Sequence, residues 1–559
     1  MMLSEIKPVL IVGAGPTGMT AAMELARLGV PVRLIDKKSV PDTTSRAIGI
    51  QARTLELFEQ RGLTDEMLRL GNRSLAASIY GDGKRVLRLD YRHVDSRYDY
   101  ILFLSQAETE RILREQLARE NITVERPVEM IALAQKESGS HPGTSGGVTA
   151  TLRHADGALE EVEAAYLISA EGAHSTVRSS LGLEFSGKSL SEDYALGDLH
   201  VEGDLPATDL HIFSSKYGFM GMFPMGGGHF RLIASNPLSK PSKDTEPSLE
   251  ELQKMYDMRS HIPVKFHELT WSSWFRINSR MIDHLQQGRI FLGGDSAHIH
   301  SPAAAQGMNT GIQDMINLAW KLAFVMQGTA SPKLLGTYSE DRIPVIRNVL
   351  AKTEGLTEVI GAENPVFRTL FEHVAPMMVG TDFVQENSAS RMSQVALNYR
   401  MSTLSETHGH HGRLRAGDRV PDMTLRVMNP GGSAEQAPRE ARLFSLLNPS
   451  RFTLLFVEPR EPASLHAEVQ ARLASWHSFI DGHQIAPLQE PGESKHFANQ
   501  FGSGQSLVLI RPDGYIGFLG SDDALPALAN YLGKWFTPEE DTKKKNDLEG
   551  HPGNYHAKS

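Results

Sequence analysis

Apolar runs, a glycine turn and an amphipathic stretch alternate over residues 9–36. Val9 to Val12 is a continuous apolar run, which is typical of a strand buried on both faces of a parallel sheet. Apolar residues at helical spacing run from Met19 to Leu28, and Gly29 marks the end of that helix. Val32 to Asp36 then has the pattern of a second strand. The segment therefore predicts one βαβ unit with parallel strands.

A helix and a pair of strands are predicted next along the chain. Residues 107–119 have helical periodicity, and Thr123 to Leu133 and Val148 to Leu152 have the pattern of paired strands. The polar, glycine-rich stretch 136–147 between the two strands is typical of a hairpin tip. These elements extend the α/β pattern of the first unit.

From about residue 190 to residue 285 the pattern becomes rich in β-strands. His211 to Phe213, Phe219 to Met225 and His229 to Ala234 have the pattern of antiparallel strands. Gly226 to Gly228 is predicted to form the turn of the last hairpin. An insertion of this kind predicts a separate sheet.

The C-terminal part of the chain predicts helices, a linker and a further αβ domain. Helices are expected through Trp320 to Ala323 and over Leu350 to Met401, and the polar stretch 406–412 is typical of a linker. A fresh αβ pattern continues to about residue 537, and the polar residues 543–559 are typical of disorder.

Length and charge narrow the classes of function. The chain has 559 residues, enough for two or three domains, and a net charge of -10, which argues against nucleic-acid or anionic-membrane partners. It has no apolar run near the ~20 residues that a membrane span needs, and its first residues lack a signal-peptide core. We therefore expect no membrane partner and a cytoplasmic location.

The cysteine and histidine content limits the metal sites, disulfides and nucleophiles that the chain can contain. The chain has no cysteine, which excludes disulfides, thiolate metal sites and a thiol nucleophile. Its 22 histidines include no HExxH or similar spacing, and we assign His408, His410 and His411 to a solvated linker. No metal site is expected.

A glycine turn of the form GxGxxG joins the first strand to the first helix. Gly13 permits the tight turn, Gly15 lets the backbone approach a pyrophosphate, and Gly18 lets the helix pack closely on the strand. Asp36 lies 18 residues beyond Gly18, close to the ~20 expected of an acid that binds a ribose. Such a turn alone often serves packing only, but with strand, helix and acid it predicts a Rossmann-type nucleotide site.

A second ligand motif lies in the middle of the chain, over residues 288–311. An apolar strand ends at Gly294 and Asp295, and a loop rich in Pro, Ala and Gly leads to a helix that begins near Gly307. A carboxylate at a strand end, followed by backbone N–H groups at a helix start, suits a ligand with hydroxyls and polar ring edges. Two such sites predict one large dinucleotide held at both ends, and FAD meets that requirement.

The motifs occur in an order that carries a family resemblance. They are GAGPTG (13–18), SRA with ARTLE (45–56), QAETE (106–110), AEGAHSTVR (170–178) and GRIFLGGDSAHIHSP with GMNTGIQDMINLAWKL (288–322). As a set they resemble the FAD-dependent aromatic hydroxylases, the single-component flavoprotein monooxygenases. The layout is most similar to phenol-type members, such as the pentachlorophenol monooxygenases and the 3-(3-hydroxyphenyl)propionate hydroxylases.

The resemblance implies an α/β (α+β) architecture in three parts. A Rossmann-type FAD-binding domain would comprise residues 1–190 and 286–405, with an interleaved β-sheet substrate domain at 191–285. A C-terminal thioredoxin-like domain would follow at 413–537, and a disordered tail at 538–559. Because the chain has no thiol, the thioredoxin-like domain is expected to be structural or oligomeric.

The resemblance also implies contacts to FAD. Asp295 would hold the ribityl chain, Pro302 would lie beside the isoalloxazine ring, and the N–H groups near Met308 and Asn309 would face its pyrimidine edge. The residues expected to bind FAD are Gly13, Gly15, Pro16, Thr17, Gly18, Asp36, Lys37, Arg46, Gln106, Glu171, Gly294, Asp295, Pro302, Gly307, Met308 and Asn309.

Two positions depart from the family pattern. Glu171 stands where the family has aspartate, which leaves its part in pyrophosphate or nicotinamide binding open. Ala304 and Ala305 replace a common Gly-Gly, which is expected to stiffen the loop beside the flavin.

The family's reaction would be the hydroxylation of a small phenolic substrate, in aromatic catabolism. NADH or NADPH would reduce the flavin, O2 would form a C4a-hydroperoxide, and one hydroxyl would enter ortho or para to a ring hydroxyl. No second GxGxxG follows a strand, so nicotinamide is expected to bind transiently in a shallow groove. A homodimer is compatible with the resemblance.

The β-rich segment is expected to form the floor of the substrate pocket. Arg231, His211 and Pro302 are the expected catalytic residues, since a cation near a phenol favours the more reactive phenolate. The other interpretation places Arg231 and His211 on the solvent face of a sheet. The expected substrate contacts are His211, Phe213, Tyr217, Met222, Phe223 and Arg231.

Two other hypotheses stay open at the level of sequence. The same chemistry on a polycyclic or antibiotic substrate would need no different motif. A non-catalytic escort protein with the FAD fold would differ in flavin content, because a protein without flavin is colourless.

Overall fold

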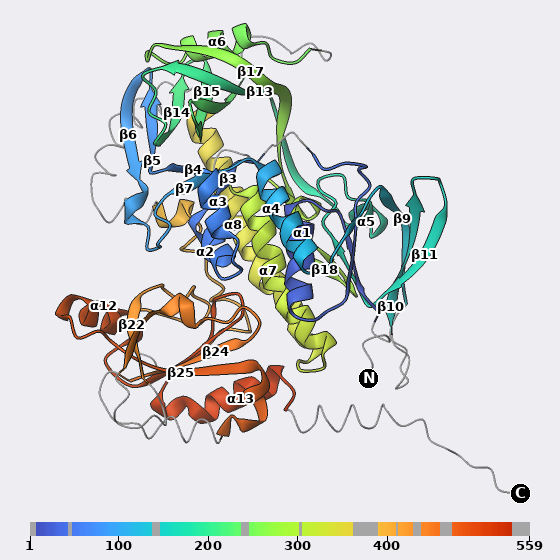
Figure 1. Cartoon of the computed structure of the whole chain (residues 1–559), viewed down its shortest axis with the longest axis vertical. Coiled ribbons are helices and arrows are strands. Elements are labelled where there is room, and N and C mark those ends of the chain that lie inside the picture. The colour runs from blue at the N-terminus through green and yellow to red at the C-terminus, as the bar shows by residue number, and fades with distance from the viewer. Residues whose placement is uncertain are drawn as a thin grey trace, which may run out of the picture.

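The computed structural model describes residues 7–42, 47–136, 146–235, 245–300, 305–361, 389–409, 412–428, 438–458 and 472–538, without side chains at 190–192 and 354–361. An upper sheet capped by a helix, a middle layer of long helices and a parallel sheet, and a C-terminal sheet follow one another along the long axis (Figure 1). The expected α/β (α+β) fold class, with a Rossmann-type unit, is confirmed. None of the described helices is long and apolar enough to cross a membrane.

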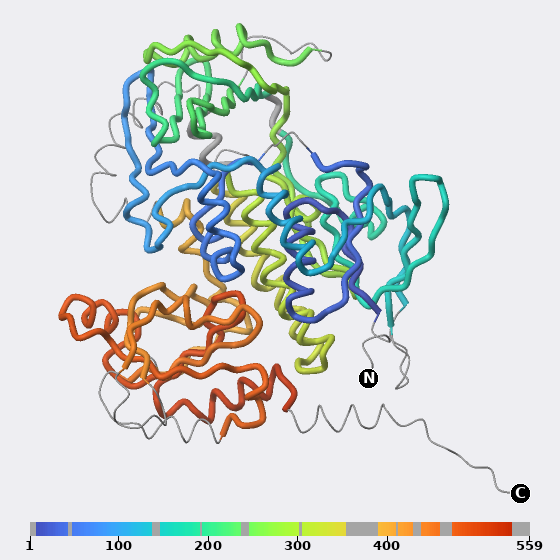
Figure 2. The backbone as a smooth tube through the Cα atoms, in the orientation of Figure 1, coloured from blue at the N-terminus to red at the C-terminus, as the bar shows by residue number. Residues whose placement is uncertain are grey.

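The predicted βαβ unit is the centre of the middle layer. β1 pairs in parallel with β2 and with β12, and every residue of β1 is buried, as its apolar run requires. Helix α7 packs along α1, although the two helices are far apart in sequence (Figure 2). In sheet order the strands are β18 (Gln286–Gln287), β19 (Ile290–Leu292), β12 (Tyr166–Ser169), β1 (Val9–Val12), β2 (Val32–Ile35) and β8 (Val124–Glu125).

The helices agree with the predicted ones in the N-terminal half. The helix expected near residues 107–119 is α4, and its N-cap Ser105 accepts a hydrogen bond from the backbone N–H of Glu108. The helices are α1 (Pro16–Arg27), α2 (Ala52–Glu59), α3 (Thr64–Leu70), α4 (Gln106–Arg119), α5 (Thr176–Ser180), α6 (Leu249–Asp257), α7 (Gly307–Met326), α8 (Thr337–Gly361), α12 (Pro491–Phe501) and α13 (Leu525–Trp535).

The upper sheet contains the predicted β-rich segment and three strands that the sequence did not assign to it, of which β20 is supplied by residues 298–299. Residues 76–90 supply β5 and β6, which lie outside the predicted interval 191–285. The three glycines 226–228 turn the β15–β16 hairpin with positive φ, as predicted. In sheet order the strands are β20 (His298–Ile299), β17 (Val264–Met281), β13 (Ser186–Gly203), β16 (His229–Ser235), β15 (Gly218–Gly226), β14 (Asp209–Ser215), β5 (Ala76–Gly81) and β6 (Lys84–Asp90).

Two small sheets flank the middle layer. The predicted strand pair is confirmed for β9 and β10, which run antiparallel from Val128 to His154. The predicted start of the first strand at Thr123 is wrong, because Val124–Glu125 form β8 and pair with β2 of the parallel sheet. The tip residues 137–145 lie outside the described part of the chain. The strands are β11 (Leu159–Ala164), β10 (Gly147–His154) and β9 (Val128–Lys136) in one sheet, and β3 (Gly49–Ile50), β7 (Ile101–Phe103) and β4 (Asn72–Ser74) in the other.

Two predictions for the C-terminal part of the chain are wrong in part. The expected linker supplies strand β21, which pairs in parallel with β27, so part of the polar stretch belongs to the sheet. The helical prediction over 350–401 fails from Ser393 to Met401, where the chain forms turns and an isolated bridge. In sheet order the strands are β21 (Glu406–His408), β27 (Ile516–Ser521), β26 (Ser506–Ile510), β24 (Phe452–Val457), β25 (Ile480–Ala486), β22 (Thr424–Met428) and β23 (Arg439–Arg442).

The C-terminal sheet shares a hydrophobic core with helix α7. The Trp320 ring of α7 meets the Phe452 ring of β24 edge-on, with 5.4 Å between centroids, and Phe324 lies 6.0 Å from the same ring. Trp320, Phe324 and Phe452 are all buried in one cluster with residues of α1. The C-terminal sheet is therefore joined to the middle layer through apolar contact.

Removal of the chain after residue 412 is expected to prevent the rest from folding. The deletion would expose Trp320 and Phe324, and burying one aromatic side chain contributes about 1.5–3 kcal/mol. We expect loss of a cooperative thermal transition in circular dichroism and aggregation in gel filtration. A chain ending at residue 538 keeps every described contact and is the control. A truncated chain that stays monomeric and melts cooperatively would contradict the shared core.

Candidate functional site

In the glycine turn at the N-terminus of α1, each glycine has the local geometry expected from the sequence. A Cβ on Gly13, whose φ is 102°, would clash with the carbonyl of Ala170, and a Cβ on Gly18 would clash with the carbonyl of Gly13. A Cβ on Gly15 would meet no atom within 4 Å among the described residues, its chain neighbours aside. The two outer glycines are therefore required by packing, and Gly15 borders open space at the positive end of a helix.

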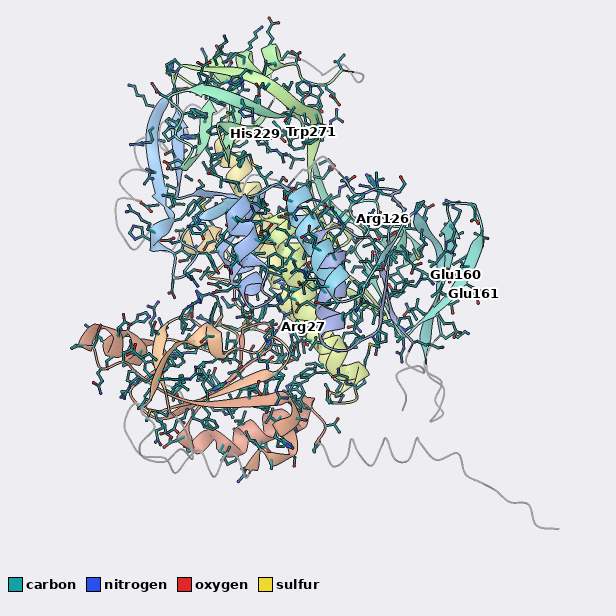
Figure 3. All side chains as sticks on the ribbon, in the orientation of Figure 1. Arg27, Arg126, Glu160, Glu161, His229 and Trp271 are labelled. Atoms are coloured by element: carbon teal, nitrogen blue, oxygen red, sulfur yellow. The ribbon has the colours of Figure 1, made fainter. Side chains whose placement is uncertain are left out.

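Asp36 lies beside this turn, at the end of β2. Its Oδ2 accepts a hydrogen bond of 2.8 Å from the backbone N–H of Ala14, and its Oδ1 accepts one of 2.8 Å from that of Lys38. Arg126 places Nη1 3.1 Å from the same Oδ1 (labelled in Figure 3). A carboxylate has about four acceptor positions, so capacity remains for the hydroxyls of a ribose. Lys37 is exposed at the same edge.

The second motif meets the first in space. Gly294 has a φ of 56°, and a Cβ there would lie 2.5 Å from Oγ1 of Thr17 in α1. A Cβ on Gly311 of α7 would lie 2.5 Å from the same oxygen. Only glycine lets the Gly294 turn and the two helices approach so closely. The turn that carries the exposed Asp295 is thereby fixed next to the glycine turn of α1.

Asp314 of α7 holds the Gly294 turn from behind. Its Oδ2 accepts hydrogen bonds from the backbone N–H of Gly294 at 3.0 Å and from Nε2 of His298 at 2.7 Å. Its Oδ1 lies 2.7 Å from Nε of Arg342 in α8. Burial by itself would raise the pKa of Asp314, but Arg342 and His298 outweigh it and lower the pKa to about 2. Asp314 had no predicted role, although a carboxylate in a buried helix indicates that the charge must be paired.

The loop before α7 is tied to strand β3. The Asn309 side chain accepts a hydrogen bond of 2.9 Å from the N–H of Gln51 and donates to the carbonyls of Gly49 and Ala305 at 2.8 Å. Ala305 has a φ of 50°, in the region that favours glycine, which agrees with the family's glycine at this place. Asn309 thus fixes the start of α7 relative to Gly49, Gln51 and Ala305. Gly307 and Met308 start the helix.

The remaining predicted FAD residues fall into three groups. Glu171 accepts hydrogen bonds from Oγ of Ser175 at 2.6 Å and from the N–H of Val177 at 3.0 Å, so its carboxylate serves the N-terminus of α5. Gln106 donates to Glu110 at 2.9 Å, at the start of α4. Pro16 and Thr17 begin α1. Arg46, Pro302 and Ala304 lie outside the described residues.

The upper sheet separates the predicted substrate residues onto two faces. Side chains alternate along each strand. His211, Phe213 and Met222 point to the outer face, where α6 covers them, and Phe223 and Arg231 point to the inner face. The expectation of one pocket surface shared by His211, Phe213, Met222 and Arg231 is therefore wrong.

The outer residues have structural partners. His211 donates from Nε2 to the carbonyl of Pro206 at 2.8 Å and accepts from the Tyr80 hydroxyl at 3.2 Å, and burial lowers its pKa. Tyr217 lies in the β14–β15 turn, at the opposite end of β15 from the glycine hairpin 226–228.

The inner face borders the loop before α7. Phe223 meets Phe103 of β7 edge-on at 5.8 Å, and a Cβ on Gly49 would touch both Phe103, at 3.5 Å, and Ala305, at 2.6 Å. Arg231 is the cross-strand partner of Phe223. These contacts connect the sheet, β7, β3 and the loop without a gap.

Arg231 is paired on this face. Its Nε and Nη2 donate to the two oxygens of Asp198 at 2.6 Å each, and the guanidinium lies 5.5 Å from the Trp271 ring centroid. Within the described part of the chain, Nη1 is buried without a hydrogen-bond partner. Arg231 is therefore a neutralised donor aimed along the inner face, rather than the free cation that the sequence suggested.

Sequence reasoning missed three inner-face residues. Asp198 and Trp271 are register partners on β13 and β17, and His229 precedes Arg231 by two residues (Figure 3). Burial lowers the pKa of His229, and its Nε2 has no hydrogen-bond partner in the described residues. The two-residue spacing from Arg231 was the signal that could have found His229. No group of His, Asp and Glu among the described residues could hold a metal ion.

Acid stability tests the Asp314 cluster. A carboxyl whose folded-state pKa is lowered stabilises the fold above its unfolded value near 3.8, and this contribution is lost as pH falls toward 2. The shift to about 2 corresponds to about 2 kcal/mol. Asp314→Asn should reduce the free energy of unfolding at pH 7 by about 3 kcal/mol and flatten the decline of the melting temperature below pH 5.

Glu66→Gln is the matched control for the Asp314 substitution. The Arg69 side chain lowers the pKa of Glu66 to about 2 as well, but the pair is exposed to solvent. Solvent screens exposed pairs, so the melting curve of this variant should follow that of the parent at each pH. Equal acid sensitivity of parent and Asp314→Asn would show that this carboxylate contributes nothing to folding.

Comparison with known proteins agrees with this geometry. The family described as "FAD binding domain" matches residues 7–353, and the family described as "Aromatic-ring hydroxylase, C-terminal" matches residues 414–538. The chain is 34% identical to 6-methylpretetramide 4-monooxygenase of Streptomyces rimosus, over 97% of this chain and 96% of the relative. It is 32% identical to pentachlorophenol 4-monooxygenase of Sphingobium chlorophenolicum, over 82% and 81% of the two chains.

A solved structure extends the likeness to the whole fold. The anhydrotetracycline hydroxylase OxyS from Streptomyces rimosus superposes with a TM-score of 0.73 at 27% identity, covering 95% of this chain and 99% of that one. The open space at Gly15, the fixed Gly294 turn and the oriented start of α7 suit the two ends and the ring of FAD. The chain belongs to the FAD-dependent aromatic hydroxylases and is a flavin-dependent monooxygenase.

Proposed function

We propose that this monooxygenase hydroxylates a phenolic ring ortho or para to its hydroxyl, with NADH or NADPH and O2 as co-substrates. The observation that carries the proposal is the unpaired Nη1 of Arg231, buried on the inner face of the upper sheet beside Trp271. A donor of this kind suits the oxygen of a phenol or phenolate. The contact of Phe223 with Phe103 brings this face next to the loop before α7.

Arg231 and His229 have different roles, which are substrate binding and proton transfer. Arg231 binds the substrate oxygen through Nη1, while Asp198 keeps its other two nitrogens fixed. His229 is kept neutral by burial, so its Nε2 can accept the proton that a phenol loses. A phenolate carries more electron density on its ortho and para carbons, which is the property that hydroxylation needs.

The cofactor is held by the residues described above. Bound FAD supplies electron transfer from the nicotinamide and the activation of O2. We assign the pyrophosphate to the open side of Gly15, a ribose to Asp36, and the ribityl chain to Asp295. The N–H groups at the start of α7 would stabilise negative charge on the ring, because a helix N-terminus is positive. Nicotinamide would bind at the surface, and a homodimer is the proposed assembly.

A polycyclic phenol is the second candidate substrate. Half-buried apolar side chains follow two strands along the inner face, with Trp271 beside Arg231, and together they form a surface broader than one ring needs. These side chains are Phe219, Met225, Trp271, Phe275 and Met281. Relatives named for 6-methylpretetramide and for pentachlorophenol support the wide and the narrow substrate respectively.

Flavin content tests the cofactor assignment and the escort hypothesis together. The purified protein should be yellow and release FAD on heating. Gly15→Val should fold but bind FAD at least about 10-fold more weakly, because its side chain would fill the space assigned to the pyrophosphate. Gly492→Val, in similar open space on α12, is the control. A colourless protein after reconstitution with FAD would favour the escort hypothesis.

Substrate stimulation tests the reaction. Oxidation of NADH or NADPH should rise about 10-fold with a true phenolic substrate, which corresponds to ~1.4 kcal/mol of barrier. Arg231→Lys keeps the charge opposite Asp198 but removes Nη1, so stimulation should fall and more O2 should leave as hydrogen peroxide. Met220→Leu, on the outer face, is the control. If single-ring and polycyclic phenols all leave nicotinamide oxidation unchanged, phenol hydroxylation is rejected.

A further inference from the structure

A turn of the C-terminal domain enters the space between α7 and α8. Arg511 donates from Nη2 to Oδ2 of Asp341 in α8 at 2.7 Å. Asp513 accepts hydrogen bonds at Oδ2 from Asn317 at 3.2 Å and from the Trp320 indole at 3.3 Å, both in α7. All five side chains are buried. The turn between β26 and β27 therefore ends inside the FAD-binding part of the molecule.

Charges of opposite sign are matched around this turn. Lys321 of α7 donates to the same oxygen of Asp341 as Arg511, at 2.7 Å. Arg53 of α2 donates to the carbonyl of Asp513 at 2.7 Å. Taking such ions out of water costs several kcal/mol each, and the cost is offset only when partners hold them in one geometry. Such a set tolerates little displacement of the turn.

Tyr399 connects this set to the Asp314 cluster. Its hydroxyl accepts a hydrogen bond of 2.9 Å from Nη1 of Arg342, whose Nε binds Asp314. Its ring lies 4.1 Å from the Tyr515 ring, and the Arg511 guanidinium lies 5.1 Å from its centroid. Tyr399 thus contacts both the C-terminal turn and the arginine that orients Asp314.

Helix α8 provides a second connection. Asp341 and Arg342 are adjacent in the chain. The Asp341 carboxylate pairs with Arg511, whereas the Arg342 guanidinium binds Asp314 and the carbonyl of Thr310. Asp314 in turn holds the N–H of Gly294. A shift of Arg511 therefore reaches the Gly294 turn through buried contacts at every step.

We propose that Arg511 of the C-terminal domain is a positioning residue for the FAD-binding turn at Gly294 and Asp295. It acts through Asp341 and Tyr399 on Arg342 and Asp314. The C-terminal domain, which has no thiol for redox chemistry, thereby contributes to the geometry of the flavin site.

The test measures how fast FAD leaves the full-length holoprotein on dilution, followed by the rise in flavin fluorescence. Arg511→Met should accelerate release about fivefold, as expected of a residue coupled to a distant site. It should also change the vibronic shape of the flavin absorption band, which general destabilisation alone would not alter. Arg511→Lys, which restores the charge opposite Asp341, should recover part of the parent rate.

Arg442→Gln is the matched control. Arg442 joins the same two parts of the molecule through Glu59, at 2.7 Å, but has no contact with Arg511, Tyr399 or Asp314 among the described residues. FAD release and the flavin spectrum should stay at the parent values. A rate increase equal to that of Arg511→Met would show that loosened docking suffices, and would overturn the proposal.

Two further variants keep the proposal testable if Arg511→Met does not fold. Tyr399→Phe keeps the ring between Arg511 and Tyr515 and removes only the acceptor for Arg342, so it should also accelerate release. Combining it with Asp314→Asn should give less than the product of the single effects, because both act through Arg342. If the effects of the two substitutions on the release rate multiply, or if Tyr399→Phe releases FAD at the parent rate, the proposal is overturned. Neither outcome would affect the assigned FAD chemistry.

Discussion

The rest of the structure depends on the buried carboxylate of Asp314. A charge without water must obtain its partners from the protein, and these come from the Gly294 turn, from His298 of β20 in the upper sheet and from Arg342 of α8. Each partner belongs to a different part of the fold. The hydrogen bonds of this one side chain therefore fix the Gly294 turn, the start of β20 and helices α7 and α8 relative to one another. The close approach of Thr17 to Gly294 adds α1 to this arrangement.

The division of the upper sheet into two faces separates the predicted substrate residues. The outer face is closed by α6 and contains apolar residues together with a hydrogen-bonded His211. The inner face holds the pair of Arg231 and Asp198 beside aromatic side chains, and Phe223 connects it to the middle layer. Because Asp198 neutralises Arg231, no uncompensated charge is buried. The remaining guanidinium nitrogen, Nη1, is held in a fixed position from which it can donate a hydrogen bond.

The C-terminal domain contacts the middle layer through both apolar and charged side chains. Its sheet shares apolar contacts with α7 through Trp320 and Phe452. Its turn at Arg511 completes the charges of a neighbouring helix. Apolar contact holds the two parts together, while the ion pairs permit one relative position, because buried charges lose much of their stabilisation when displaced.

The sequence by itself determined the βαβ unit, the two FAD motifs and the family, because the glycine turn, Asp36 and the Gly294 turn act through local backbone geometry. It also determined strands β14, β15 and β16 of the β-rich segment, but not the long strands β13 and β17, nor that residues 76–90 join their sheet, since strand pairing is nonlocal. Only the tertiary structure decided that Arg231 faces inward and His211 outward. Their relative faces follow from the strand register, in which His211 pairs with Met222 and Arg231 pairs with Phe223, and α6 covers the face of Met222. The partners of Asp314 and Arg511 were likewise decided in three dimensions, because they come from segments that share no local pattern.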